Sequence, residues 1–171
     1  MKLSAIKFVL LFLAQVAVWN YFNFTQYLFL VYLPALILCL PLRFGTVRTM
    51  VVAFLSGLVA DFLVTGQLGM TSLALVPVAL MRQSVVRLAF GSELFARGED
   101  LSLHRQGWPK FLLCIVILTA IYLAIHIWVD GAGMYSLGFG ALKFGISLLV
   151  SSAVSMAIAY LMLEQTGERW R

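Results

Sequence analysis

Charged side chains are scarce in this chain. Only 11% of its 171 residues are Asp, Glu, Lys or Arg, whereas 63% are apolar; a soluble domain has about 25% charged and about 45–50% apolar residues. This balance excludes a soluble globular enzyme, and it excludes a disordered tail because such tails are poor in apolar residues. The composition predicts an integral membrane protein, all-α, with one domain covering residues 1–171.

Cysteines are few, and the motifs of common enzymes are absent. Cys39 and Cys114 lie in apolar runs without the spacing of a metal site or a disulfide framework. The chain has no HExxH motif and no P-loop, and Phe54 occupies the place where a serine-hydrolase motif around Ser56 would need glycine. We therefore expect no enzymatic activity, no catalytic residues, no metal and no cofactor.

The apolar runs are long enough for six membrane-spanning helices, at about 20 residues per span. Pro77 falls inside one of them and is expected to kink it, whereas Pro109 suits a first helical position. The longest polar stretch is expected to be a cytoplasmic loop over residues 89–108. The six helices are predicted at 3–21, 25–42, 47–64, 70–88, 109–129 and 137–163.

The basic residues predict the orientation of the bundle. With six spans, every Lys and Arg except Lys143 falls on one side. Cytoplasmic loops are enriched in these residues, so both termini are predicted to be cytoplasmic. Trp19 and Trp128 would then mark the outer boundary, and Trp108 and Trp170 the inner one. The net charge of +5 is explained by orientation, so we expect membrane lipids, but no nucleic acid, as partners.

Two ionisable residues lie at similar depth near the outer side. Asp61 and Lys143 are each roughly 9 Å below the outer boundary by helical rise. Both extend stripes of small residues that recur every four positions and therefore share a helix face. These stripes predict that both side chains face the bundle interior, paired directly or through water. Fixing helix register, or an outward-reaching Lys143, are the plainer alternatives. The stripes are Ala53, Gly57 and Asp61, then Lys143, Ser147, Ser151, Ser155 and Ala159.

Three further polar residues lie within predicted helices or directly after one. His126 and Asp130 are one turn apart, which suits an interfacial polar cap better than a catalytic dyad because no second histidine is near. Arg82 lies about 12 Å from the inner boundary, so its side chain is expected to extend towards that boundary. Its depth argues against a pairing with Asp61.

The stretch from the third predicted helix into the fourth resembles a family signature. Residues 56–63 read SGLVADFL and residues 68–74 read LGMTSLA. A Gly-Leu-x-x-Asp near the end of one helix, here Gly57 to Asp61, followed by a Leu-Gly turn at Gly69, is similar to the signature of the bacterial rod shape-determining MreD family. The run Pro41–Gly45 and the position of Arg82 also fit.

The resemblance implies a non-enzymatic inner-membrane component of the cell-elongation machinery, which builds the peptidoglycan of rod-shaped cells. Members of the family dock MreC, a bitopic membrane protein. Through MreC they are linked to the actin-like MreB filament, to RodA and to a penicillin-binding transpeptidase. Small-residue stripes could accept a partner helix by close contact.

A transporter subunit is the alternative. Six spans of this total length also suit the substrate-binding subunit of an energy-coupling-factor vitamin transporter, to which the MreD fold is similar. Such subunits usually carry an AxxxA motif in their first helix, which Ala5, Ala14 and Ala17 do not form here. Asp61, His126 and Lys143 are the residues that could line an outward pocket.

Overall fold

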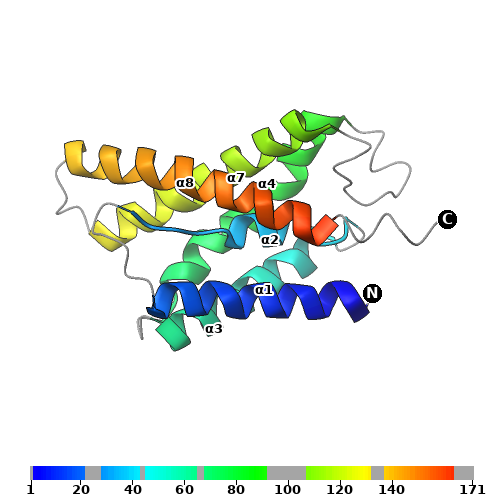
Figure 1. The fold of residues 1–171 in the computed structure, drawn as a ribbon, viewed down its shortest axis with the longest axis horizontal. Coiled ribbons are helices and arrows are strands. Elements are labelled where there is room, and N and C mark those ends of the chain that lie inside the picture. The colour runs from blue at the N-terminus through cyan, green and yellow to red at the C-terminus, as the bar shows by residue number, and fades with distance from the viewer. Residues whose placement is uncertain are drawn as a thin grey trace.

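A computed structural model describes residues 2–21, 28–42, 45–64, 68–91, 107–131 and 137–163. These residues form an all-helical bundle, apart from a short extended stretch before the second helix (Figure 1). The all-α expectation is thereby confirmed. The helices are α1 (Lys2–Tyr21), α2 (Leu33–Leu38), α3 (Thr46–Val64), α4 (Met70–Phe90), α7 (Trp108–Gly131) and α8 (Leu137–Leu163).

Four helices, α3, α4, α7 and α8, are long and apolar enough to cross a membrane. With α1, which has 20 residues, they agree with five of the six predicted helices to within two residues at each end. The chain is therefore a membrane protein. The predicted loop over 89–108 is shorter at both ends, because α4 continues to Phe90 and α7 begins at Trp108. The rest of that loop, residues 92–106, lies outside the described residues.

The second predicted helix is wrong in extent. Instead of 25–42, only Leu33–Leu38 is helical, and residues 29–32 before it have no helical structure. Pro34 explains the difference, since its nitrogen carries no hydrogen and its ring collides with the carbonyl four residues earlier. Pro34 therefore suits the start of a helix, where it lies in α2, but it does not permit a helix through residue 30.

The short helix α2 lies in the middle of the bundle. All six of its residues are buried, and it is packed among α1, α4, α7 and α8. Figure 1 shows the extended stretch and α2 running antiparallel to α1, which lies at the edge of the bundle. The consecutive pairs α3–α4 and α7–α8 also pack against each other, and α4 against α7. Buried polar groups of α2 and the stretch before it must therefore find partners on these helices.

Candidate functional site: internal polar contacts and an ion pair at one end

Asp61 caps the start of α4. Its side chain is buried, with 1% of the residue exposed. The backbone N–H of Gly69 donates to Oδ2 at 2.9 Å, and the N–H of Thr71 lies 3.0 Å from both carboxylate oxygens. The first N–H groups of a helix have no partner inside it, and they carry the positive end of its dipole. Asp61 therefore fastens the end of α3 to the beginning of α4.

Gly57 allows the same two helices to approach closely. A Cβ atom at this position would lie 2.6 Å from Ser72 Cα, which is far closer than van der Waals contact. Ser72 Oγ donates to the carbonyl of Phe54 at 3.1 Å, across the same contact. Gly57, Asp61, Gly69, Thr71 and Ser72 together form what we call the α3–α4 clamp. The residues that carry the family resemblance are thus the ones that join these helices.

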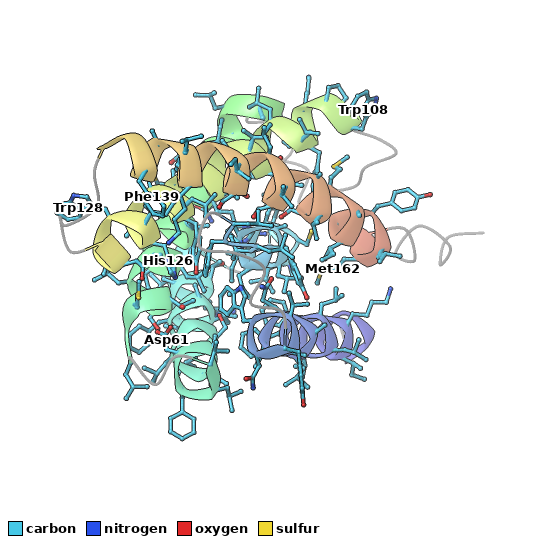
Figure 2. All side chains as sticks on the ribbon, turned by 60° about the vertical axis from the view of Figure 1, so that its left-hand side comes forward. Asp61, Trp108, His126, Trp128, Phe139 and Met162 are labelled. Carbon is cyan, nitrogen blue, oxygen red and sulfur yellow. The ribbon has the colours of Figure 1, made fainter. Side chains whose placement is uncertain are left out.

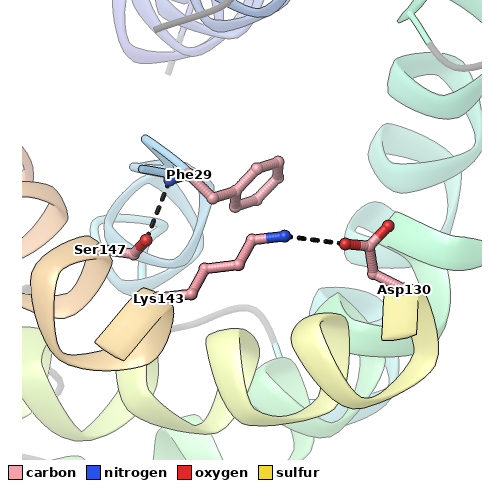
Figure 3. Close-up of polar contacts among 4 residues, drawn as sticks. All are labelled: Phe29, Asp130, Lys143 and Ser147. Atoms are coloured by element: carbon pink, nitrogen blue, oxygen red, sulfur yellow. Dashed lines mark hydrogen bonds and ion pairs between the residues drawn. The ribbon is translucent and has the colours of Figure 1, made fainter. Parts of the chain in front are cut away.

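Asp61 faces the interior, as predicted, since 1% of the residue is exposed. Lys143 forms an ion pair with Asp130: its Nζ donates to Asp130 Oδ2 at 2.9 Å (Figure 3). The pairing of Lys143 with Asp61, directly or through water, stays a prediction. Lys143 and Asp130 side chains are 12% and 35% exposed. The carboxylate of Asp61 accepts hydrogen bonds within its own hairpin. Asp130 is the residue before the last one of α7, and it contacts Lys143 of the next helix, α8.

Arg82 donates hydrogen bonds to backbone carbonyls at the C-terminal end of α2. Only 1% of this residue is exposed. Its Nε and Nη2 atoms donate to the carbonyl of Leu38 at 3.3 and 3.1 Å, and Nη2 also donates to the carbonyl of Leu40. Its Nη1 atom reaches Thr49 Oγ1 at 3.4 Å. The sequence did not predict that Arg82 is buried against these carbonyls, which need a donor because α2 ends inside the bundle. The direction of its side chain relative to the inner boundary stays a prediction.

One edge of the extended stretch is bonded by α1. Gln15 Nε2 donates to the carbonyl of Leu30 at 3.1 Å, and Gln15 Oε1 accepts the N–H of Tyr32 at 3.0 Å. Trp19 Nε1 donates to the same Leu30 carbonyl at 2.7 Å. The side-chain amide of Gln15 therefore pairs with a backbone carbonyl and a backbone N–H, as the peptide groups of a neighbouring strand would. These contacts satisfy the carbonyl that a helix would have paired with residue 34.

The other edge is bonded by the serine stripe of α8. The N–H groups of Phe29 and Val31 donate to Ser147 Oγ and Ser151 Oγ at 2.9 and 3.0 Å, and Ser151 Oγ donates to the carbonyl of Phe29 at 3.2 Å. Ser155, the next residue of the stripe, is buried, and its hydroxyl has no partner within the described parts of the chain. The stripe faces the interior, but at two of its positions it bonds backbone as well as allowing close packing.

His126 lies among aromatic rings. Its ring is tilted against those of Phe29 and Tyr122, with centroids 4.3 and 5.5 Å away, and Trp19 is stacked on Phe29 at 5.4 Å. The residue is 7% exposed. Asp130 forms an ion pair with Lys143, whereas the ring of His126 contacts Phe29 and Tyr122. The polar cap of His126 and Asp130 stays a prediction. Figure 2 shows Asp61 and His126 in the same part of the bundle.

No protein-family profile, curated protein or solved structure matches this chain. Within the described ranges, no group of three or more His, Cys, Asp or Glu side chains is placed to hold a metal ion.

The sequence interpretation missed Gln15, Trp19 and Thr49 as contact residues. Gln15 is a polar residue inside an apolar helix, which is a usable signal, since a buried amide needs partners. Trp19 was assigned to the membrane boundary, but its N–H is bonded inside the protein. Nothing in the sequence around Thr49 points to Arg82.

Proposed function

We propose that this chain is a non-enzymatic component of the rod-shape and peptidoglycan-synthesis machinery, and that it docks an MreC-like bitopic protein in the inner membrane. The observation that carries the proposal is the α3–α4 clamp. Gly57, Asp61 and Gly69, which carry the resemblance to the MreD family, have a shared physical task in this structure: they fix one helix hairpin. The residues that carry the resemblance therefore lie together in one helix hairpin of the fold.

The use of the other buried polar groups supports the same proposal. Gln15, Arg82, Ser147 and Ser151 all bond backbone groups of the chain between α1 and α3. Polar side chains at membrane depth are costly and need a reason to be there. Here they hold a nonhelical segment in place. Such a structural role is expected of a protein that docks a partner rather than catalysing a reaction.

The outer faces of the bundle are apolar. On α3, Val51, Phe54, Leu55 and Phe62 are exposed, whereas the small residues Ala53 and Gly57 are buried. The predicted small-residue stripes are thus used inside the bundle. We propose that docking of a partner helix uses an outer apolar face, through van der Waals contact.

The proposed topology keeps six crossings, with the second one mixed. The five extended residues 28–32 and the six residues of α2 together cover about 26 Å. This length is close to the roughly 30 Å of a bilayer core. The crossing order, and with it the proposal that both termini are cytoplasmic, is therefore retained. MreB, RodA and a transpeptidase would be reached through the docked partner.

Co-purification tests the proposal. The full chain and a tagged MreC-like protein from the same bacterium are expressed together and purified in mild detergent. We expect a stable complex that is retained when the partner is reduced to its transmembrane helix, and loss of rod shape when the chain is depleted. Absence of a complex, together with normal cell shape on depletion, would refute the proposal.

One observation favours a second candidate, a substrate-binding transporter subunit. Nonhelical backbone at membrane depth is typical of transporters, where broken helices line binding sites. Here the extended stretch lies beside Lys143, as Figure 3 shows for Phe29. Vitamin uptake that fails on depletion, in cells that keep their rod shape, would favour this candidate over docking.

A further inference from the structure

The serine stripe of α8 has one more buried hydroxyl than the extended stretch uses. Ser147 Oγ accepts the N–H of Phe29, as Figure 3 shows. One turn further along α8, Ser151 Oγ accepts the N–H of Val31. Ser155 follows after another turn; it is fully buried, and its hydroxyl has no partner within the described ranges. The stripe therefore has an unused acceptor beyond the last of these bonds.

Leu33 carries the next N–H group on this edge of the stretch. Successive N–H groups of extended backbone point to opposite sides, so those of Phe29, Val31 and Leu33 would share one side. Leu33 is instead the first residue of α2, and 2% of it is exposed. The first N–H groups of a helix have no partner inside it, and no hydrogen bond among the described residues uses this one. A buried donor is thus unused as well.

The spacing of the two elements places this donor and this acceptor at one level. Two residues of extended chain rise about 6.6–6.8 Å, and four residues of an α-helix rise about 6 Å. The bonds of Phe29 and Val31 already follow this match, so the next bond in the series would join Leu33 to Ser155. The elements that carry these two residues, α2 and α8, pack against each other.

One backbone torsion of Tyr32 turns the N–H of Leu33 away from the stripe. Tyr32 has a φ of −125°, which suits extended chain, but a ψ of 8°, whereas ψ in extended chain is about +135°. This torsion orients the peptide group that follows, so a rotation of roughly 130° would direct the N–H of Leu33 as in a strand. The bond from the N–H of Tyr32 to Gln15 Oε1 lies before the rotated torsion and would be kept.

Pro34 favours the rotated form. The residue before a proline prefers extended to helical backbone, and proline itself suits the first helical position. The opposing cost lies at the carbonyl of Tyr32, which accepts the N–H groups of Ala35 and Leu36 at 3.0 and 3.2 Å. The rotation would turn this carbonyl away from both donors. Gains and losses of a few hydrogen bonds are close in size, and the two lost bonds make the rotated form the minor one.

We propose that the segment of residues 28–38 is a two-state element. In its minor state Leu33 is extended and donates to Ser155 Oγ, and α2 begins at Pro34. Conversion of Leu33 lengthens the segment from about 26 to about 28 Å. A longer crossing suits a thicker bilayer, so bilayer thickness would bias the two states. This bias rests on the membrane crossing proposed above, whereas the hydrogen bond is independent of it and of docking.

Relaxation dispersion by nuclear magnetic resonance tests the two states. The full chain, isotope-labelled, is placed in lipid nanodiscs, and the backbone amides of Leu33 and Leu36 are followed. The method detects exchange on the microsecond-to-millisecond timescale of such local rearrangements. We expect exchange at both amides, with a minor population between about 0.1 and 10%. Flat profiles at both amides of the unaltered chain would overturn the proposal.

Two variants and a matched control identify the hydrogen bond. Ser155→Ala removes the acceptor and should abolish the exchange at Leu33. Pro34→Ala removes the preference of Leu33 for extended backbone, so it should suppress the exchange as well. Ser152→Ala is the control, because Ser152 Oγ donates to the carbonyl of Leu149 in its own helix, and exchange should be unchanged. Exchange that persists in Ser155→Ala, or is equally lost in Ser152→Ala, would overturn the proposal.

Lipids of different acyl-chain length test the change in length separately. We expect the minor population to be about twofold larger in nanodiscs of long-chain lipids than in those of short-chain lipids, since a longer crossing reduces the mismatch. This rise should be absent in Ser155→Ala. Exchange that depends on Ser155 but not on acyl-chain length would support the hydrogen bond and overturn the effect of bilayer thickness.

Discussion

Pro34 lies four residues after Leu30, and the carbonyl of Leu30, which a continuous helix would direct at residue 34, is bonded by side chains of α1 instead. A proline nitrogen cannot donate a hydrogen bond, so the carbonyl is left without a partner in its own segment. An unpaired carbonyl in hydrocarbon costs several kcal/mol, on the order of 2–7. The position of one proline thus requires buried donors on a helix that precedes it.

Replacing Gln15 tests this dependence. Gln15→Met preserves the side-chain volume but removes one donor to Leu30 and the acceptor for Tyr32. We expect the free energy of unfolding to fall by about 2–3 kcal/mol, since buried backbone groups lose partners. Denaturant titration in mixed micelles, followed by circular dichroism, measures the loss. Asn20→Leu, an exposed position on the same helix, is the control and should change stability by less than about 0.5 kcal/mol.

Gly57 gives a test of close packing. In Gly57→Ala the new Cβ would lie 2.6 Å from the backbone of Ser72, so α3 and α4 must separate. We expect a destabilisation of about 1–3 kcal/mol by thermal unfolding.

The matched control is Gly145→Ala, within α8, where nothing lies within 4 Å of the added atom. Alanine is the better helix former, so this variant should be stabilised by up to about 1 kcal/mol. Equal effects of the two substitutions would show that the α3–α4 contact is looser than described.

Asp61 allows a graded substitution. Asp61→Asn retains one acceptor oxygen for the N–H groups of Gly69 and Thr71, whereas Asp61→Ala retains none. We expect losses of about 1 and about 2–3 kcal/mol, respectively, because a helix cap and buried N–H groups are involved. Equilibrium unfolding of both variants measures the difference. If Asp61→Ala is no worse than Asp61→Asn, the capping role is wrong.

Removing Arg82 should be the most damaging of these changes. Arg82→Met leaves the carbonyls of Leu38 and Leu40 without this donor inside the bundle, at a cost of about 3 kcal/mol or more. Protease resistance of the purified chain should fall accordingly. Arg48→Met, an exposed residue of α3, is the reference and should remain resistant; a sensitive Arg48→Met would mean that the loss follows positive charge in general.

The long helices could be predicted from the sequence because hydropathy and length decide them. The α3–α4 clamp was only partly predictable: Gly57, Asp61 and Gly69 stood out in the sequence, but the contacts between them and with Thr71 and Ser72 did not. The predicted helix over 25–42 was too long because the run of 35 uncharged residues between Lys7 and Arg43 hides Pro34, which does not permit a helix through residue 30.

The other buried hydrogen bonds join residues that are far apart in the sequence, and no local sequence pattern indicates such pairs. Phe29 bonds Ser147, which is 118 residues later, and Arg82 bonds Leu38, which is 44 residues earlier. The ion pair between Lys143 and Asp130 was not predicted either. The rotation of each helix about its axis decides which residues meet, and periodicity gives only the buried face.

The serine stripe of α8 has a consequence for biogenesis. The amide hydrogens of Phe29 and Val31 acquire their acceptors only when residues 147 and 151 have been synthesised and have entered the bilayer. The ribosome makes this stretch early in translation, yet its hydrogen bonds to α8 form only after the last described helix has been made. A nascent chain stopped before α8 would expose an unfinished segment to the translocon, or to the quality-control proteases of the membrane.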